Sequence, residues 1–246
     1  MDKIIAIIPA RYNSSRFPGK PLALINKKPM IQWVYERVSA NKNIIDVYVA
    51  TDDKRIFQCV QEFGGKVIMT STKHFSGTDR IAECIEILDL KDNDVVLNVQ
   101  GDEPLIEQSM LDELILTIRD KSVLMGTLKE QISDSKDIEN PNIVKVITDN
   151  DDNAIYFSRF PIPYKRNKEE DLIYYRHVGI YAYRVLFLKE YMNLPKSNLE
   201  KAENLEQLRV LEHGYKIRVK ETHYDSIGVD IPEDILKVER ILGERE

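Results

Sequence analysis

Short apolar segments alternate with amphipathic helical patterns through the first part of the chain, and this alternation limits the fold more than any other feature. The apolar segments are KIIAIIP, DVYVAT, KVIMT and DVVLNVQ, and the helical patterns between them cover 30–40, 54–63 and 79–88. Such a rhythm predicts right-handed strand-helix-strand units. The strands are apolar almost throughout, as is typical of strands buried on both faces. We therefore expect an α/β fold with a mostly parallel central sheet.

The pattern changes after Val123. Strand-like segments VKVIT, AIYFS and HVGIYAY follow, separated by the turn signals NPN and DNDDN. Helices are expected over 187–192, 199–213 and 231–242, with a strand over 216–221. This half of the chain predicts a smaller β-rich elaboration of one α/β domain that spans residues 1–246.

Charge and cysteine content narrow the class of protein. A formal net charge of −6 disfavours a nucleic-acid-binding surface. The segment MDKIIAIIPAR has too short an apolar stretch for a signal peptide or a membrane span, so a cytoplasmic protein without membrane partners is expected. Cys59 and Cys84 lie in helical patterns without a cysteine or histidine cluster, which favours reduced core thiols over zinc or a disulfide.

The segment IPARYNSSRFPGKPL follows the first strand and holds three cations, Arg11, Arg16 and Lys20. It is not a P-loop, because Ser14 replaces the required first glycine and Pro21 replaces the serine or threonine after the lysine. Pro21 also pushes Lys20 towards an extended conformation, so no helix is expected to begin directly at this lysine. Planar guanidinium groups and a mobile ammonium suit phosphate oxygens, although a solvated basic loop paired with carboxylates is the simpler alternative. The combination of these groups suits a triphosphate better than a single phosphate. The position of the loop at the carboxyl end of a strand, where open α/β sheets bind ligands, favours phosphate binding over the simpler alternative.

Asp102 and Asp230 are candidate ligands of Mg²⁺. Asp102 follows the fourth strand in NVQGDEP and should lie at the same sheet edge as the basic loop, and Gly101 allows the chain to turn there. Asp230 lies just ahead of the last predicted helix, where capping of that helix is the favoured interpretation. Metal binding becomes the better interpretation only if the two carboxylates meet in space.

Eight motifs, in this order along nearly the whole chain, resemble the 3-deoxy-manno-octulosonate cytidylyltransferases. They are IPARYNSSRFPGKPL, VATDD, SGTDR, NVQGDEP, YFSR, HVGIYAYR, LEQLRVLEHG and GVDIPED. The resemblance implies a Rossmann-like nucleotide-diphospho-sugar transferase fold, usually a homodimer. It implies an enzyme that couples CTP to 3-deoxy-manno-octulosonate (Kdo), releases pyrophosphate, and supplies lipopolysaccharide or capsule synthesis.

The resemblance also implies site residues, position by position. Nucleotide binding falls on Ala10, Arg11, Arg16, Lys20, Ser76, Gly77, Arg80 and Gln100. The sugar site falls on Gln100, Arg159, His177, Tyr181, Glu206 and Gln207. The resemblance implies that Asp102 and Asp230 bind Mg²⁺. Together with Arg11 and Lys20 they form the expected catalytic set. The nucleotide-binding half would cover about 1–122, a sugar-binding and dimerisation elaboration about 123–215, and a closing metal loop and helix about 216–246.

Each sugar-site residue has a simpler structural interpretation. Arg159 could pair with a nearby acid, and a lone histidine such as His177 is more often structural than catalytic. Tyr181 lies four positions further on, so both side chains should share one face of a strand. Glu206 could be a solvated helix residue. Two functional alternatives also stay open: the same chemistry on 8-amino-Kdo or a sialic acid, and a non-catalytic nucleotide-binding protein.

Overall fold

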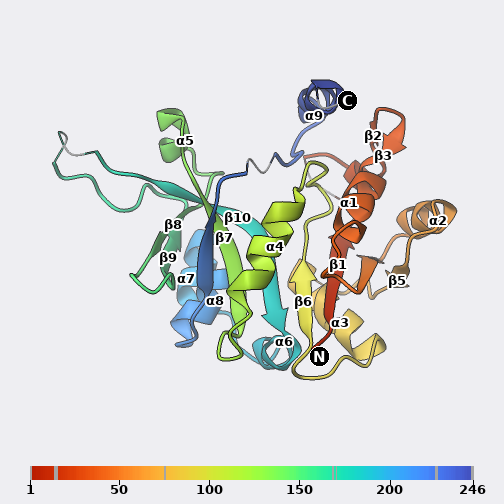
Figure 1. Cartoon of the computed structure of the whole chain (residues 1–246), viewed down its shortest axis with the longest axis horizontal. Coiled ribbons are helices and arrows are strands. Elements are labelled where there is room, and N and C mark those ends of the chain that lie inside the picture. Colours follow the sequence, from red (N-terminus) through yellow and green to blue (C-terminus); the bar gives the residue numbers. More distant parts are fainter. Residues whose placement is uncertain are drawn as a thin grey trace. The chain divides into compact units, whose positions relative to one another are not determined.

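The computed structural model describes residues 2–13, 16–74, 76–167, 169, 171–224 and 227–244 (Figure 1). The chain divides into a first unit, Met1–Asp112 with Ser226–Glu246, and a second unit, Glu113–Asp225. Helix α4 (Gln108–Thr117) crosses the boundary in the sequence. The functional division expected near residues 122 and 215 stays a prediction.

The first unit contains four parallel strands. In spatial order they are β6 (Val95–Asn98), β1 (Ile4–Ala10), β4 (Asp46–Thr51) and β5 (Val67–Met69). The chain moves outward from β1 through β4 to β5 and then returns to the other side of β1 to form β6. The direction of winding therefore reverses between β1 and β6, and open α/β sheets bind ligands at the carboxyl ends of the strands beside such a reversal.

Three helices pack on these strands. Helices α1 (Met30–Ser39) and α3 (Gly77–Ile87) contact β1 and β4, and α2 (Lys54–Glu62) contacts β4 and β5. Side-chain caps stabilise the first turns of two of these helices. The Asp53 carboxylate caps α2, and Ser76 forms a capping box with Asp79 in α3. The apolar faces of α1 and α3 are buried as the helical periodicity predicts.

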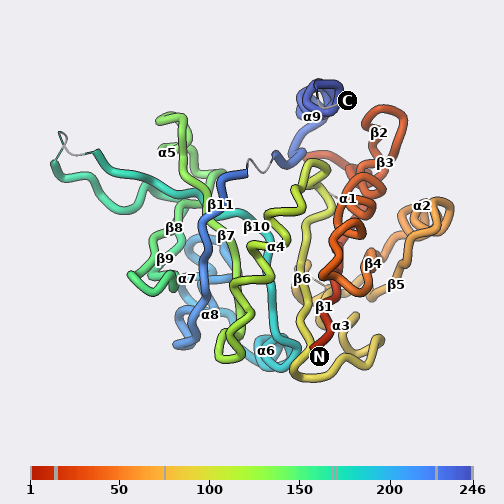
Figure 2. The backbone as a smooth tube through the Cα atoms, viewed as in Figure 1, coloured from red at the N-terminus to blue at the C-terminus, as the bar shows by residue number. Residues whose placement is uncertain are grey.

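The end of the chain packs against the segment that follows the basic loop. Helix α9 (Asp234–Glu244) lies beside the hairpin of β2 (Leu24–Ile25) and β3 (Lys28–Pro29) in the tube view of Figure 2. The two regions share a buried apolar cluster of Ile25, Met30, Leu105, Val229, Val238 and Leu242. This cluster packs the segment before α9 against the β2–β3 hairpin and the start of α1. The last helix was predicted from the sequence, but with a start at residue 231, three residues too early.

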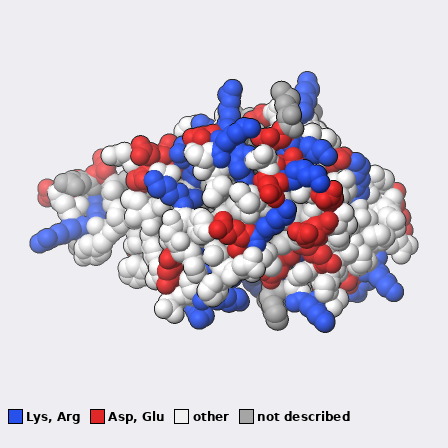
Figure 3. Space-filling view, turned by 90° about the horizontal axis from the view of Figure 1, so that it is seen from below, with Lys and Arg blue, Asp and Glu red and all other residues white. Residues whose placement is uncertain are grey.

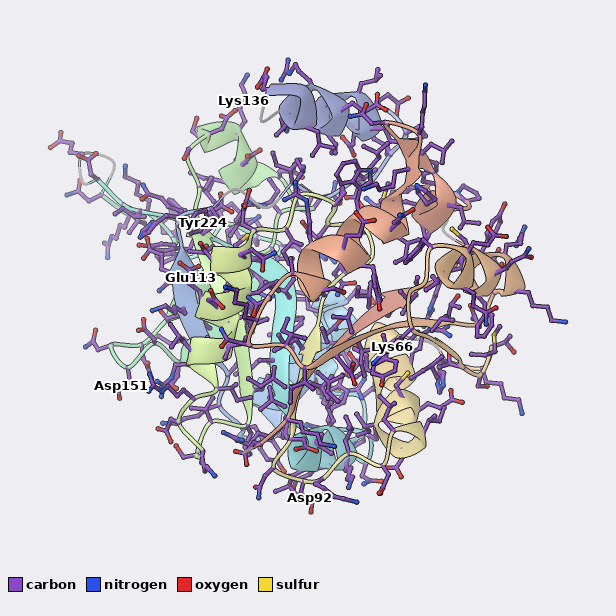
Figure 4. All side chains as sticks on the ribbon, turned by 45° about the vertical axis from the view of Figure 1, so that its right-hand side comes forward. Lys66, Asp92, Glu113, Lys136, Asp151 and Tyr224 are labelled. Carbon is purple, nitrogen blue, oxygen red and sulfur yellow. The ribbon has the colours of Figure 1, made fainter. Side chains whose placement is uncertain are left out.

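The second unit is a mixed sheet. Its strands are β7 (Met125–Gln131), β8 (Lys145–Thr148), β9 (Ala154–Ser158), β10 (Tyr175–Arg184) and β11 (Arg218–Thr222). Strand β7 pairs parallel with β11 and antiparallel with β10, while β8 pairs antiparallel with β9 and β10. Asp151, labelled in Figure 4, lies in the turn between β8 and β9. The β-rich second half is thus present, with β7 as a strand that the sequence pattern did not reveal.

The helices of the second unit are α5 (Ser135–Glu139), α6 (Val185–Tyr191), α7 (Asn198–Glu203) and α8 (Gln207–Glu212). The single helix expected over 199–213 is wrong, because Asn204 takes a left-handed conformation with φ of 53° and ends α7. A buried ion pair between Glu200 and Arg209, at 2.5 Å, joins the two short helices instead.

Within the described ranges, every helix is too short or too polar to cross a lipid bilayer. On the face drawn in Figure 3, acidic and basic side chains are interspersed.

Candidate active site

The basic loop leaves the carboxyl end of β1 and folds back on itself. The Gly19 N–H donates to the Tyr12 carbonyl oxygen at 2.8 Å, and Gly19 has a φ of 74°, which glycine adopts without steric cost. A Cβ at Gly19 would lie 3.1 Å from the Tyr12 ring. The loop therefore returns Lys20 to the strand end; Ser14 and Ser15 lie outside the described residues.

The expectation that no helix begins at Lys20 is wrong. A single 3₁₀ turn covers Lys20–Leu22, with Pro21 in its first turn. It closes through hydrogen bonds from the Leu22 N–H to the Gly19 carbonyl at 2.9 Å and from the Ala23 N–H to the Lys20 carbonyl at 3.0 Å. Proline disfavours an α-helical residue before it, but a turn of this length does not need the proline N–H.

Lys20 and Arg16 bring Asp102 and Asp230 together, and we call these two acids the carboxylate pair. Lys20 Nζ lies 2.5 Å from Asp102 Oδ2 and 3.8 Å from Asp230 Oδ1, and it also donates to the Val229 carbonyl at 2.8 Å. The Arg16 guanidinium meets both oxygens of Asp230 at 3.0 Å. Residues far apart in the sequence thus form one cation-carboxylate cluster within the first unit.

Gly101 allows β6 to end close against β1. A Cβ at Gly101 would lie 3.2 Å from the Pro9 carbonyl oxygen, a backbone atom that cannot easily move. The Asp102 carbonyl in turn accepts a hydrogen bond from the Val229 N–H at 2.9 Å. The turn after β6 is therefore held between the end of β1 and the segment before α9, which places Asp102 in the cluster.

Asp230 does not cap the last helix, so that sequence-based interpretation is wrong. Asp234, the first residue of α9, accepts hydrogen bonds through its carboxylate from the N–H groups of Asp230 and Ile231, at 2.8 and 3.0 Å. This leaves the Asp230 side chain to face Arg16 and Lys20. The two carboxylates lie 2.5 and 3.8 Å from Lys20 Nζ, so the two acids meet in space as the metal-site interpretation requires, while metal binding itself stays a prediction.

The carboxylate pair has the donor chemistry that Mg²⁺ requires. Carboxylate oxygens are hard ligands, and Mg²⁺ in nucleotide enzymes commonly takes one or two of them together with phosphate oxygens and water. Both carboxylates already converge on one positive charge, the Lys20 ammonium. Among the described residues, no group of three or more histidine, cysteine or acidic side chains could hold a metal ion. Two protein ligands suffice only if phosphate and water complete the coordination.

The remaining residues predicted for the nucleotide site lie near the ends of β1 and β6. Ala10 is buried at the end of β1, and Arg11 and Gln100 are half-buried just after β1 and β6. Ser76 and Gly77 begin α3, where a Cβ at Gly77 would make an ordinary 3.4 Å contact with the Pro9 ring. The amino terminus of α3 therefore lies beside the end of β1, in a position where backbone N–H groups favour anions.

Arg80 is fully buried beneath this edge. Its guanidinium donates to the Thr70 hydroxyl and forms an ion pair with Asp52 at 2.8 Å. The structure thus gives Arg80 a support role for the turns after β4 and β5, while its proposed contact with the nucleotide stays a prediction. Asp52 was not singled out from the sequence, although the motif VATDD contains it.

In the second unit, His177 and Tyr181 share one face of β10. Their ring centroids lie 5.2 Å apart, and Phe157 meets the His177 ring edge-on at 5.1 Å. The prediction that both side chains point the same way is confirmed, even though the register of β10 against β7 shifts between Val178 and Tyr181. Two residues are inserted there, which preserves the alternation of faces.

Burial keeps His177 and Tyr181 uncharged. It lowers the pKa of His177 to about 3, and the positive charge of Arg176 adds to this effect. Burial also raises the pKa of Tyr181 well above its usual value, with the negative charge of Glu206 as the next cause. Glu206 precedes α8 and Gln207 begins it as a buried residue. Tyr181 and Glu206 are therefore electrostatic neighbours, as a shared sugar site would require.

Acid should destabilise the protein through His177. Its folded pKa of about 3 is below the value of 6.5 expected for an exposed histidine, so the unfolded chain binds more protons between these limits. Stability is therefore lost as the pH falls below 6.5, by about 2 kcal/mol at pH 5. Denaturant unfolding at pH 7 and pH 5 should show this loss, and His177→Gln should reduce it. An equal loss in the variant would contradict the assignment.

Arg159 is held by backbone oxygens of the second unit. Its guanidinium donates to the carbonyls of Glu203 at 2.8 Å, Pro141 at 3.0 Å and Asn204 at 3.5 Å. The carbonyl of Arg159 itself accepts from Lys145 Nζ at 2.6 Å. The sequence suggested that Arg159 could pair with a nearby acid. Among the described residues, only its backbone N–H does so, by donating to Glu203 Oε2 at 3.0 Å.

A nucleotidyltransferase-like site is defined by three features: the reversal of winding between β1 and β6, the basic loop, and the cation-carboxylate cluster at this edge of the sheet. A sequence model described as cytidylyltransferase matches residues 5–217. The chain belongs to the cytidylyltransferase family. The predictions of an α/β fold of this type and of a nucleotidyltransferase are confirmed.

Two curated relatives and one solved structure are similar to this chain over nearly its whole length. The 3-deoxy-manno-octulosonate cytidylyltransferase of Thermodesulfovibrio yellowstonii is 51% identical, covering 97% of this chain and 98% of the relative. The 8-amino-3,8-dideoxy-manno-octulosonate cytidylyltransferase of Shewanella pealeana is 52% identical over 94% of this chain and 95% of the relative. A solved CMP:2-keto-3-deoxy-manno-octonic acid synthetase complexed with CTP has a TM-score of 0.94 and 45% identity over 100% of both chains. The predicted resemblance to 3-deoxy-manno-octulosonate cytidylyltransferases is confirmed.

Proposed function

We propose that this chain transfers CMP from CTP to the anomeric hydroxyl of Kdo, giving CMP-Kdo and pyrophosphate. The observation that carries the proposal is the cation-carboxylate cluster at the sheet reversal, where Lys20 Nζ lies 2.5 Å from Asp102 and 3.8 Å from Asp230. Such a cluster supplies cations for a triphosphate and carboxylates for its metal ion. Relatives about 50% identical over nearly the whole chain carry the same activity in their names.

The basic loop would bind the phosphates. Arg11, Arg16 and Lys20 all follow β1, and Lys20 has only 13% of its side chain exposed, so its charge is poorly screened. These groups offset the charge of the β- and γ-phosphates and stabilise pyrophosphate as it leaves. The present partners of Arg16 and Lys20 are carboxylates, so these two side chains are already gathered at the sheet edge, with little left to order when the nucleotide binds.

The carboxylate pair would hold Mg²⁺, as the donor set permits. A Mg²⁺ ion held there supplies Lewis-acid charge that stabilises the phosphoryl oxygens in the transition state. In the proposed step the anomeric oxygen of the sugar bonds to the α-phosphorus, and the bond between this phosphorus and the oxygen of the leaving pyrophosphate breaks. The hydroxyl proton passes to solvent, and no side chain is assigned as general base.

The second unit would bind the sugar. Arg159 supplies a cation for the sugar carboxylate, and His177, Tyr181 and Glu206 supply polar groups on one wall. The anionic sugar requires such a cation, and a guanidinium matches a carboxylate geometrically. Gln207 completes the proposed sugar set of the second unit, and the role of Gln100, a residue of the first unit, stays a prediction.

The test is pyrophosphate release by the purified chain with CTP, Mg²⁺ and Kdo, compared with 8-amino-Kdo and a sialic acid. We expect Kdo to give the highest kcat/KM, and removal of Mg²⁺ with EDTA to abolish release. The 8-amino sugar is the second candidate, because a relative named for the 8-amino sugar is 52% identical and one named for Kdo is 51% identical. Absence of release with every sugar would contradict the proposal and favour a non-catalytic nucleotide-binding protein.

Lys20→Ala should raise the KM for CTP by about 10- to 100-fold, the effect of losing a hydrogen bond to a charged group. The KM for the sugar should change little. Lys42→Ala, an exposed lysine ahead of β4, is the matched control and should leave both constants unchanged. A normal KM for CTP in Lys20→Ala would rule out the proposed phosphate contact.

A homodimer and a cytoplasmic location also stay proposals. Sedimentation equilibrium of the purified chain should give twice the mass of 28.6 kDa if the dimer forms.

A further inference from the structure

Thr127 lies in the middle of β7, fully buried, at the point where the register of β10 shifts. Its hydroxyl oxygen lies 3.0 Å from His177 Nε2, 3.1 Å from the Val178 carbonyl oxygen and 2.7 Å from the Ile180 carbonyl oxygen. All of these groups belong to β7 and β10 of the second unit. One hydroxyl therefore serves both the backbone of the irregular part of β10 and the imidazole of a proposed sugar-site residue.

The hydrogen atoms of this group can be assigned by counting. A threonine hydroxyl has one hydrogen and two acceptor lone pairs, and the two carbonyl oxygens can only accept. The hydroxyl hydrogen points to a carbonyl oxygen, and that of Ile180 is the nearer. If the hydrogen pointed to His177 instead, lone pairs of the Thr127 and Ile180 oxygens would face each other at 2.7 Å. The Thr127 oxygen consequently accepts from His177, so Nε2 must carry a hydrogen.

A neutral imidazole has one N–H, so a hydrogen on Nε2 leaves Nδ1 with a lone pair. Burial, followed by the Arg176 charge, lowers the pKa of His177 to about 3, so the ring is neutral at physiological pH. Phe157 and Tyr181 contact the ring and restrict its rotation. Among the described residues, Thr127 alone hydrogen-bonds the imidazole, through Nε2. Nδ1 is therefore a fixed acceptor.

We propose that Thr127 is a positioning residue that fixes the Nε2–H tautomer of His177, so that Nδ1 accepts a hydrogen bond from a hydroxyl of the acidic sugar. This inference rests on the proposed function, because it assumes that the sugar lies against His177. It adds a residue outside all eight sequence motifs to the sugar site and gives the histidine a defined role as an acceptor.

The tautomer can be measured without any assay of activity. Imidazole nitrogen signals of ¹⁵N-histidine-labelled protein distinguish a protonated from an unprotonated nitrogen, and His177→Asn identifies the signals of His177 among the four histidines. We expect the wild type and Thr127→Ser, which keeps the hydroxyl, to show a protonated Nε2 and an unprotonated Nδ1. Thr127→Val, which keeps the shape, should show a mixture of tautomers. A protonated Nδ1 in the wild type would overturn the inference without any variant being needed.

Kinetics test the link to the sugar. Thr127→Val should raise the KM for Kdo about fivefold, as expected for one weakened neutral hydrogen bond, with the KM for CTP unchanged. Thr127→Ser should restore the KM for Kdo. If the tautomer shifts but the KM for Kdo does not, the proposed Nδ1 contact is wrong. If the wild type uses no sugar at all, the proposed function fails, while the nitrogen signals still decide the tautomer.

Discussion

Asp102→Asn should lower kcat for pyrophosphate release about a thousandfold, which corresponds to a loss of about 4 kcal/mol of transition-state stabilisation. The substitution keeps the side-chain size but removes one of the two negative charges that converge on Lys20 Nζ. Asparagine is a poorer ligand for Mg²⁺ than a carboxylate, so the loss should fall on the chemical step. The fold should survive, because the backbone contact between Asp102 and Val229 does not involve the side chain.

Asp89→Asn is the matched control for this prediction. Asp89 follows α3, its side chain is 88% exposed, and its positive φ of 46° is one that asparagine also adopts readily. Its kcat should stay within about twofold of the wild type, as expected for a surface substitution. Both variants should unfold at similar temperatures. Turnover above about a tenth of the wild-type rate in Asp102→Asn would exclude Asp102 as a metal ligand.

Lys145→Met should destabilise the second unit by about 3 kcal/mol, or lower the melting temperature by about 10 °C. Lys145 is fully buried, and its ammonium donates to the carbonyl oxygens of Asn140, Ile143 and Arg159 at 2.9, 2.6 and 2.6 Å. Burial lowers the pKa of this lysine, so the charge itself is costly in the folded chain. Methionine fills a similar volume but leaves these oxygens without their donor.

The same substitution should also weaken sugar binding. The Lys145 ammonium holds the carbonyl of Arg159, and the Arg159 guanidinium donates to Pro141 within the loop that Lys145 also ties down. The KM for Kdo should rise while the KM for CTP stays constant. Lys201→Met, on the exposed side of α7, is the matched control for loss of a lysine. Wild-type stability in Lys145→Met would show that these carbonyls do not depend on the ammonium.

The edge of the sheet could be predicted from the sequence because it depends on local patterns and one general rule. Apolar segments separated by helical periodicity gave β1, β4, β5 and β6, and parallel strands place their carboxyl ends on one side. The basic loop after β1 and Asp102 after β6 therefore had to share an edge. The family resemblance was equally local, since it depended on motifs that can be read directly.

The partners within the site could not be predicted in this way. Asp230 was expected to cap a helix, and only the packing of α9 against the β2–β3 hairpin turns its side chain to Arg16. Asn204 interrupts a periodic pattern that is otherwise helical, because one left-handed residue costs little for asparagine and allows Glu200 and Arg209 to pair.

Sequence by itself determined the class of fold, the sheet edge that carries the site, and the types of charged group found there, since each follows from periodicity, turn chemistry or motif order. Tertiary structure alone decided which groups meet: Lys20 with the carboxylate pair, Lys145 with the backbone around Arg159, and Thr127 with His177. The physical reason is that hydrogen bonds and ion pairs require specific atoms within about 3 Å. Such distances are set by strand register and by packing between segments that are distant in the chain.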